Sequence, residues 1–574
     1  MKKILKIQLD TKTFQFVDIA ERYRGLGGRG LTSAIIAGEV AADCDALGPK
    51  NKLVFAAGIL AGTSVPNSGR LSIGGKSPLT GTIKESNAGG TAAVKLARLG
   101  LQAVVVEGCS DELVTIHLSK DGVRFESVAE LDNQGNNATI AYGRQKYGEK
   151  IGVISIGSAG QQMLTAAGIS VSSPDFMPRM AARGGLGAVM GAKRLKALFI
   201  DDTGGRAVLP RDQALYQARL KVFVSGISAH PLVGGLKALG TPLLVNMVNE
   251  LGALTTKNYS QGQFDGAEKI SGEKMAEIMA SRPNAQATHR CTSGCIIGCS
   301  QVYTDEAGIP IVSGLEYETL ALLGANCLID DLDTIARMNA VCNDIGVDTM
   351  EVGGALAVAM EGGMLEWGNG EAALSLVKDI ARGTRNGKMI GNGCHYTGEQ
   401  LGVSRIPTVK RQCLSGYDPR VLKGTGVTYA TSTMGADHTC GNALPSPANP
   451  DYDPSASTGQ APVSQFLQRY FAAVDSLGMC LFSMLPPLDM PELQDALAGC
   501  VAAILDVPLE EGYLVKLGQQ VNETERCFNE KAGFDRTADR LPLFFSQEKL
   551  APTGHLFDVS PEEMDTVHGA AGTA

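Results

Sequence analysis

The chain has 574 residues, 44% of them hydrophobic and 19% charged, so it can bury large cores and is expected to form more than one domain. Its formal net charge of −9 argues against a nucleic-acid-binding surface. The 70 glycines lie in separate motifs, and this density is typical of backbone packed closely against a bulky ligand.

Residues 1–206 are predicted to form a domain rich in β-strands. Short apolar or alternating runs bounded by turn residues indicate strands. These runs are LKIQLD, KLVFAAG, RLSIGG, AVVVEG, LVTIHLS, VRFESV, VISIGSA and KALFID. One helix is expected at 88–99, after Asn87 and before the next strand.

The rest of the chain is predicted to form two mainly helical domains, 207–410 and 411–574. Apolar residues recur at helical spacing in 211–250, 317–328, 332–344, 352–364 and 371–386. A stretch rich in Gly, Pro, Ser and Asp, 416–457, is predicted to be irregular, with helices again from Val463. The expected fold class is therefore mixed α/β (α+β) and multidomain, with the sheet-rich domain first.

No segment reaches the roughly 18 uncharged apolar residues of a membrane span. Lys6 and Asp10 interrupt the apolar run that a secretory signal would need. The 13 cysteines at irregular spacing are not typical of a disulfide framework. We therefore expect a cytoplasmic protein with no membrane span and no nucleic-acid partner.

Four cysteines form a split set that suits an iron–sulfur cluster. Cys291, Cys295 and Cys299 lie in one short run, and Cys480 lies far downstream. A [4Fe–4S] cluster takes four cysteine ligands. A zinc site would pair C-x2-C units, and the chain has no second pair. Radical enzymes that use adenosylmethionine have a shorter second gap, near the N-terminus. Three buried structural cysteines remain the alternative.

The remote cysteine ends a segment that has a near-copy upstream. Segment 2, residues 475–480, reads DSLGMC, and segment 1, residues 343–348, reads NDIGVD. Because one copy ends on a candidate cluster ligand, the repeat predicts two equivalent contacts with a pseudo-symmetric group beside the cluster.

Glycine-rich turns in the first domain are expected to bind phosphate. Backbone amides at glycine turns and helix N-termini favour anions, and Arg70 can add bidentate hydrogen bonds. The turns follow Asn87 and Ala182. Each of them alone is equally compatible with a tight turn, and no P-loop pattern occurs.

With these motifs in order from about residue 4 to at least 480, the chain resembles the tungsten-containing aldehyde:ferredoxin oxidoreductase family. The resemblance rests on GGRGL at 27–31, KSPLTG at 76–81, ESNAGG at 85–90, RGGLGAVMG at 183–191, EYET at 316–319, GYDPR at 416–420, YATS at 429–432, GADH at 435–438 and segments 1 and 2.

The resemblance implies the cofactors. Two molybdopterin-type pterins supply four sulfurs to one tungsten, the protein gives the metal no ligand, and Mg²⁺ bridges the pterin phosphates. No side chain chooses tungsten over molybdenum. Arg70 is similar to an arginine between one pterin and the [4Fe–4S] cluster, and each segment is similar to one that holds one pterin. The implied cofactor-binding residues are Arg70, Asn87, Gly89, Ala182, Arg183, Gly184, Gly185, Asn343, Val347, Asp348, Asp475, Met479 and Cys480.

Two positions depart from the family pattern. The first cysteine pair is usually C-x2-C, and here Cys291-x3-Cys295 contains one more residue. Segment 1 begins with Asn343 where the family usually has Asp, which removes one charge beside the pterin.

Glu318 and His438 are the acid–base candidates, because the family places a glutamate and a histidine beside the metal. Spacing back from Asn343 favours Glu318 over Glu316, the alternative two positions earlier. Asp437, Tyr417 and Cys440 are weaker neighbours.

The resemblance implies oxidation of an aldehyde to a carboxylic acid, with electrons leaving through the cluster to ferredoxin or to a ferredoxin-like iron–sulfur subunit. A homodimer and a hetero-oligomer are both compatible with the sequence. Two alternatives remain open: a relative that reduces a carboxylic acid or a thioester-linked aromatic substrate, and a non-catalytic iron–sulfur electron-transfer subunit.

Overall fold

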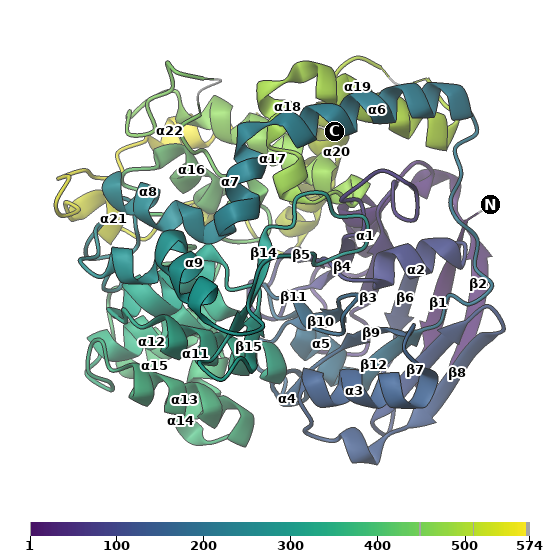
Figure 1. Ribbon diagram of the computed structural model, residues 1–574, viewed down its shortest axis with the longest axis horizontal. Coiled ribbons are helices and arrows are strands. Elements are labelled where there is room, and N and C mark those ends of the chain that lie inside the picture. Colours follow the sequence, from purple (N-terminus) through teal and green to yellow (C-terminus); the bar gives the residue numbers. More distant parts are fainter. Residues whose placement is uncertain (1, 447–448, 509, 570–574) are drawn as a thin grey trace.

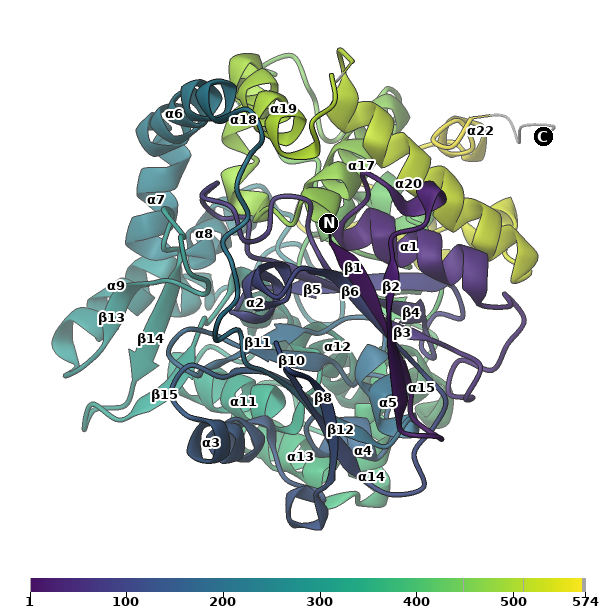
Figure 2. The same cartoon turned by 90° about the vertical axis from the view of Figure 1, so that its right-hand side faces the viewer.

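The computed structural model describes residues 2–446, 449–508 and 510–569. Figures 1 and 2 show the strands of the N-terminal part gathered on one side, with the helices of the remaining chain packed beside and above them.

Residues 3–200, all of them described, form two six-stranded sheets with the same topology. The first sheet has the order β2 (Thr13–Asp18), β1 (Lys3–Gln8), β6 (Leu101–Glu107), β3 (Leu53–Ala57), β4 (Leu71–Lys76) and β5 (Ile83–Ala88). The second, in the same sense, has β8 (Gly122–Ser127), β7 (Val114–Ser119), β12 (Leu195–Ile200), β9 (Gly152–Ser155), β10 (Ile169–Ser172) and β11 (Pro178–Ala181). The β1–β6 and β7–β12 pairs are parallel and the others antiparallel. The N-terminal part is therefore an internal structural repeat.

Side chains of the strands alternate between two cores. In β6, Val104 and Val106 face a core shared by both sheets, whereas Ala103 and Val105 pack towards helix α1 (Gly28–Glu39). The shared core also contains residues of α2 (Ala92–Arg98) and α5 (Leu186–Ala192). Because both faces are buried, β6 is an almost continuous apolar run.

The remaining chain is mainly helical. Its helices are α6 (Gln213–Ala229), α7 (Pro231–Leu239), α8 (Leu244–Glu250), α9 (Gly272–Ser281), α10 (Tyr317–Thr319), α11 (Leu332–Ile345), α12 (Thr349–Glu361), α13 (Gly370–Arg382), α14 (Arg385–Gly391), α15 (Gly393–Leu401), α16 (Lys423–Thr431), α17 (Gln460–Leu477), α18 (Pro486–Asp489), α19 (Pro491–Leu505), α20 (Tyr513–Lys531), α21 (Phe544–Gln547) and α22 (Pro561–Met564). A small sheet contains β13 (Gln286–His289), β14 (Ser300–Thr304) and β15 (Pro310–Ser313), and β16 (Thr408–Val409) pairs with β17 (Gln412–Cys413). The N-terminal part adds α3 (Asn136–Tyr147) and α4 (Ser158–Gln161).

The predicted fold class is confirmed, and each predicted strand is present. The helix predicted at 88–99 begins only at Ala92, because Ala88 ends β5 and Gly90 has φ 114°. The predicted helical stretch 211–250 is divided at His230, since Pro231 starts a new helix.

The stretch 416–457 was predicted to be irregular, and this is wrong for α16. Its nine residues are all buried. A helix that is buried on every side has no amphipathic pattern for the sequence to reveal.

Within the described residues, no single helix is long and apolar enough to cross a membrane. Two bent helix pairs, α6 with α7 and α17 with residues 481–489, reach that length and composition only jointly.

Candidate functional site

Segments 1 and 2 are the C-terminal ends of α11 and α17. Each helix ends on a glycine in the left-handed region, Gly346 with φ 79° and Gly478 with φ 75°. The next residue, Val347 or Met479, donates its N–H back to the last helical turn over 2.9 or 3.1 Å. The shared sequence pattern is therefore a shared helix-capping motif, in which only glycine takes the required φ without strain.

The two segments dock at equivalent places in the internal repeat. The carbonyl of Gly346 accepts from the N–H of Gly168, just before β10, over 2.9 Å. The carbonyl of Gly478 accepts from the N–H of Arg70, just before β4, over 3.1 Å. Since β4 and β10 are counterparts, the two segments are related in the backbone as they are in sequence.

Two glycines permit this docking, and substituting them should destabilise the protein. A Cβ on Gly58 would lie 2.3 Å from the carbonyl oxygen of Leu477, and one on Gly157 would lie 2.2 Å from that of Ile345. We expect Gly58→Ala and Gly157→Ala each to lower the free energy of unfolding by about 1–3 kcal/mol, which is typical of overpacking, and to lower the melting temperature.

The matched control is Gly234→Ala in α7, where no atom lies within 4 Å of the added methyl group. Alanine is the better helix former by about 1 kcal/mol, so this variant should melt at or slightly above the wild-type temperature. If all three variants melted at the wild-type temperature, the close approach of Gly58 and Gly157 to the two helix ends would be contradicted.

The structure brings the four candidate cluster cysteines together. Each of the six pairs among these cysteines contains a thiol whose pKa is raised by the charge of the other thiolate. Burial raises the pKa of the Cys480 thiol to about 12; Arg70 opposes this rise, and Cys291 and Cys295 add to it. Uncompensated thiolates are therefore disfavoured here, and iron would compensate them. The thiols do not surround a single point, because no three His, Cys, Asp or Glu of the described chain are arranged around one metal ion.

Asn67, which the sequence analysis missed, joins the two parts of the split set. Its Nδ2 donates to Cys295 Sγ over 3.3 Å, and its carbonyl accepts from the N–H of Cys480 over 2.8 Å. In the sequence, its position in the same short run as Arg70 could have identified it as a site residue.

Arg70 and Asn87 connect to Asp475, the first residue of segment 2. Arg70 donates from Nη2 to the Asn87 carbonyl over 3.1 Å and from Nε to its Oδ1, and Asn87 Nδ2 donates to Asp475 Oδ1 over 3.1 Å. Burial raises the pKa of Asp475 to about 6, against the charges of two arginines. A Cβ on Gly89 would lie 3.1 Å from Cys291 Sγ, so this turn touches the cysteine group.

The loop Ala182–Gly185 follows β11 and leads into α5, as residues 89–91 follow β5 and lead into α2, and Asn87 is the second-last residue of β5. Gly184 has φ 85° and Gly185 has φ 73°. Arg183 connects segment 1 to the loop of the candidate histidine: its Nε pairs with Asp348 Oδ2 at 3.2 Å, and its Nη1 donates to the Ala436 carbonyl over 2.8 Å. Asn343 is less central, and its carbonyl accepts from Asn136 Nδ2.

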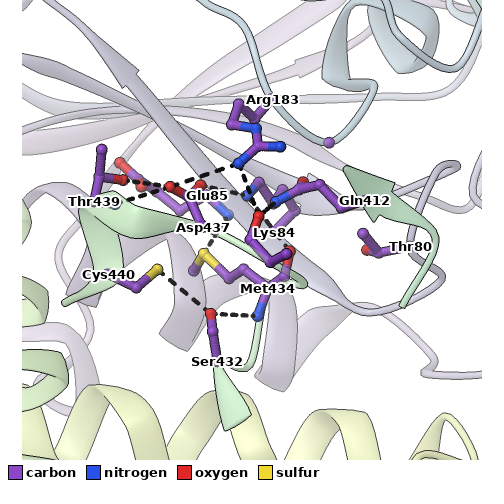
Figure 3. A network of polar contacts seen from close by, with 12 residues as sticks. Thr80, Lys84, Glu85, Arg183, Gln412, Ser432, Met434, Asp437, Thr439 and Cys440 are labelled. Carbon is purple, nitrogen blue, oxygen red and sulfur yellow. Dashed lines mark hydrogen bonds and ion pairs between the residues drawn. The ribbon is translucent and has the colours of Figure 1, made fainter. Parts of the chain in front are cut away.

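Figure 3 shows Asp437 between two cations. Its carboxylate lies 3.4 Å from Lys84 Nζ and 3.9 Å from Arg183 Nη1, and it accepts from Thr439. Against the effect of burial, Lys84 and Arg183 hold the pKa of Asp437 well below its usual range. The neighbouring Glu85 Oε1 is buried without a hydrogen-bond partner, and burial raises the pKa of Glu85 to about 8. Lys84 and Glu85 were missed, although both are buried polar residues of β5.

Glu318 and His438 are in contact, with 3.3 Å between Glu318 Oε1 and His438 Nε2. Neither Glu318 Oε1 nor His438 Nδ1 has a hydrogen-bond partner, and His438 Nδ1 faces Asp437 Oδ1 at 4.0 Å. The two side chains are 13% and 15% exposed, whereas Glu318 Oε1 and His438 Nδ1 themselves are buried. Burial raises the pKa of Glu318, and His438 opposes this rise. Tyr417 lies beside His438, with 5.7 Å between ring centroids.

Glu316 faces away from this pair. Its Oε2 accepts from Thr241 Oγ1 over 2.6 Å, and its charge raises the pKa of Cys299 after burial. Glu316 therefore borders the cysteines, and Glu318 borders the histidine.

Comparison with known proteins gives matches over almost the whole chain. The family described as "Aldehyde ferredoxin oxidoreductase, N-terminal domain" matches residues 4–202, and "Aldehyde ferredoxin oxidoreductase, domains 2 & 3" matches residues 220–567. The tungsten-containing aldehyde ferredoxin oxidoreductase of Pyrococcus furiosus is 33% identical, over 96% of this chain and 92% of the relative. The enzyme of the same name from Thermococcus kodakarensis is 32% identical over the same shares.

A solved structure shares the fold. It is described as "Active site complex BamBC of Benzoyl Coenzyme A reductase in complex with 1,5 Dienoyl-CoA", and it superposes with a TM-score of 0.79 at 19% identity over 99% of this chain and 93% of that chain.

Proposed function

The chain belongs to the aldehyde ferredoxin oxidoreductase family of oxidoreductases, and on that premise we propose that it oxidises an aldehyde to a carboxylic acid and passes the electrons through a [4Fe–4S] cluster to ferredoxin or an iron–sulfur subunit. Tungsten is the metal named for its relatives. The net reaction takes one water and one aldehyde, and yields one carboxylic acid, two protons and two electrons.

The residues present fit the implied groups. Two equivalent helix ends and two equivalent glycine turns suit two pterins related by pseudo-symmetry. Asn87, near the end of β5, and Ala182, just after β11, would hold the magnesium and phosphate end. Glu85, Glu318 and His438 keep polar atoms without hydrogen-bond partners in the interior, as expected beside a polar ligand. Cys291, Cys295, Cys299 and Cys480 would hold the cluster.

The contact between Glu318 and His438 carries the proposal for the chemistry. When bound, the tungsten–pterin group supplies the two-electron redox step. Glu318 Oε1 accepts a proton from the attacking water, and its raised pKa suits that role. His438 Nε2 lies 3.3 Å from Glu318 Oε1 and Nδ1 faces Asp437 Oδ1 at 4.0 Å, so Nε2 is the ring nitrogen on the Glu318 side that would donate to the substrate oxygen. Asp437, held between Lys84 and Arg183, fixes the loop that carries the imidazole.

Metal quantitation and an anaerobic substrate screen test the proposal. We expect about four iron atoms per chain with tungsten, and aldehyde-dependent reduction of ferredoxin or a viologen dye. Iron without tungsten or molybdenum, in protein made with both available, would favour the electron-transfer subunit. Reduction of a carboxylic acid or aromatic thioester without aldehyde oxidation would favour the reductase alternative.

Arg183→Ala should lower tungsten content per folded protein while leaving iron closer to normal. The side chain pairs with segment 1 through Asp348 and begins the second glycine turn, both on the pterin side of the site. Metal analysis is compared with Arg282→Ala, which removes an arginine that follows α9 and pairs with Asp333 of α11. Normal tungsten and activity in Arg183→Ala would show that this loop is only a structural turn.

A further inference from the structure

Arg179 is a buried arginine without an ion-pair partner. It extends from β11 and is only 9% exposed. Its Nη1 donates to Ser300 Oγ and the Ser313 carbonyl over 2.9 and 3.2 Å, and its Nη2 donates to Ser313 Oγ and His289 Nδ1 over 2.7 and 2.9 Å. These acceptors are all neutral, and Nε has no partner. Of the salt bridges within 4.0 Å in the described chain, none includes Arg179.

Other buried arginines of the site are neutralised by carboxylates. Arg29 pairs with Glu525 at 2.8 Å, and Arg183 pairs with Asp348 at 3.2 Å. A buried charge is strongly unfavourable unless it is paired. The side chains in contact with Arg179 supply no anion. The buried carboxylate of Glu316 lies near Nη1, since both approach the Gly314 Cβ position, but it is beyond ion-pair distance and burial raises its pKa, so it neutralises Arg179 only in part.

The cysteine group lies next to Arg179. His289, which accepts from Arg179, forms a β-bridge with Cys299 and precedes Cys291 by two positions. A Cβ on Gly314, which has φ 80°, would lie 2.6 Å from Arg179 Nη1, so this glycine leaves space for the guanidinium. Ser300, whose Oγ accepts from Arg179 Nη1 over 2.9 Å, directly follows Cys299.

Hydrogen bonds through His289 to Asp175 fix the orientation of Arg179. A guanidinium only donates, so His289 Nδ1 must accept, and Nε2 then carries the ring proton. Nε2 lies 2.7 Å from Asp175 Oδ2 and donates to it. The chain Asp175–His289–Arg179 thus holds the guanidinium against the cysteine group.

We propose that Arg179 is the buried counter-charge of the iron–sulfur cluster and raises its reduction potential. This inference rests on the proposed cluster. Cluster and thiolates together are anionic, and reduction adds one more negative charge. A fixed cation beside them stabilises the reduced form more than the oxidised form. Arg70 acts from the pterin side, and Arg179 acts from β11.

The test is the midpoint potential of the cluster, followed by electron paramagnetic resonance during a redox titration. Arg179→Gln should keep about four irons and favour the oxidised form at least tenfold more than wild type does, a shift of about 59 mV or more to lower potential. Arg179→Lys keeps the charge and should stay close to wild type. Arg282→Gln is the matched control: it removes an arginine packed on the same small sheet but already neutralised by Asp333, and it should leave the potential unchanged.

Each outcome decides the question. An unchanged potential in Arg179→Gln overturns the proposal. Loss of iron in Arg179→Gln with retention in Arg179→Lys supports it, whereas loss in both shows that hydrogen-bond geometry, not charge, is what matters. Wild-type protein made with iron available and lacking a cluster would instead defeat the proposed function, which separates the two failures.

Discussion

Glu318→Gln is expected to fold, keep both cofactors and lose at least about a hundredfold in kcat, because general-base catalysis contributes about 10²–10⁴-fold. Glu318 Oε2 accepts a hydrogen bond from the Gly416 N–H over 2.7 Å. Glutamine is nearly isosteric with glutamate, so its amide oxygen can accept the same hydrogen bond. Its amide cannot accept the proton at neutral pH. The change in KM should be smaller than the change in kcat. Steady-state kinetics with metal analysis of each preparation measures both.

Glu316→Gln is the matched control, since the two residues share one motif but face different groups. It should retain most of the turnover, because Glu316 borders Thr241 and the cysteines and not His438. An inactive Glu316→Gln beside an active Glu318→Gln would mean that the register is wrong. His438→Asn should lose activity to a similar order if His438 stabilises the developing charge on the substrate oxygen. Normal turnover in both glutamate variants would exclude carboxylate base catalysis in this segment.

Cys480→Ala should lose or degrade the cluster and also weaken pterin retention. Cys480 ends segment 2, and its N–H donates to the Asn67 carbonyl, while Asn67 contacts Cys295 Sγ. Removing one of four cluster ligands therefore also loosens the helix end beside Asp475. Iron content, visible absorbance and electron paramagnetic resonance follow the cluster, and tungsten content follows the pterin.

Cys500→Ala is the control for removing a buried thiol. Cys500 is fully buried in α19 and lies in a hydrophobic core cluster. Its loss should lower stability modestly and leave iron content unchanged. An intact cluster spectrum in Cys480→Ala would rule out the assigned ligand set.

Much of the fold was predictable because its signals are local. β6 and β12 are apolar runs bounded by turn residues, and α11 has apolar residues at helical spacing and begins at Asp331, which caps it. The edge strand β2 was not predicted. β2 is largely exposed, so it lacks the buried face that produces an alternating pattern. The fully buried α16 was missed because its sequence, KGTGVTYAT, is rich in glycine and threonine and shows no apolar residues at helical spacing.

In the candidate site, too, some features follow from local sequence and others from the tertiary structure. The sequence by itself determined the family resemblance, the split cysteine set and the equivalence of segments 1 and 2, because each is a motif of fixed spacing and a left-handed glycine constrains its own neighbours.

Only the tertiary structure decided which side chains meet. Glu316 and Glu318 lie two positions apart, and their different partners depend on a backbone that changes from extended at Glu316 to helical at Glu318. Arg179 belongs to no motif, and its acceptors come from residues 289, 300 and 313 of a separate sheet. Contacts across such distances depend on how the sheets and helices pack, and no local spacing in the chain encodes them.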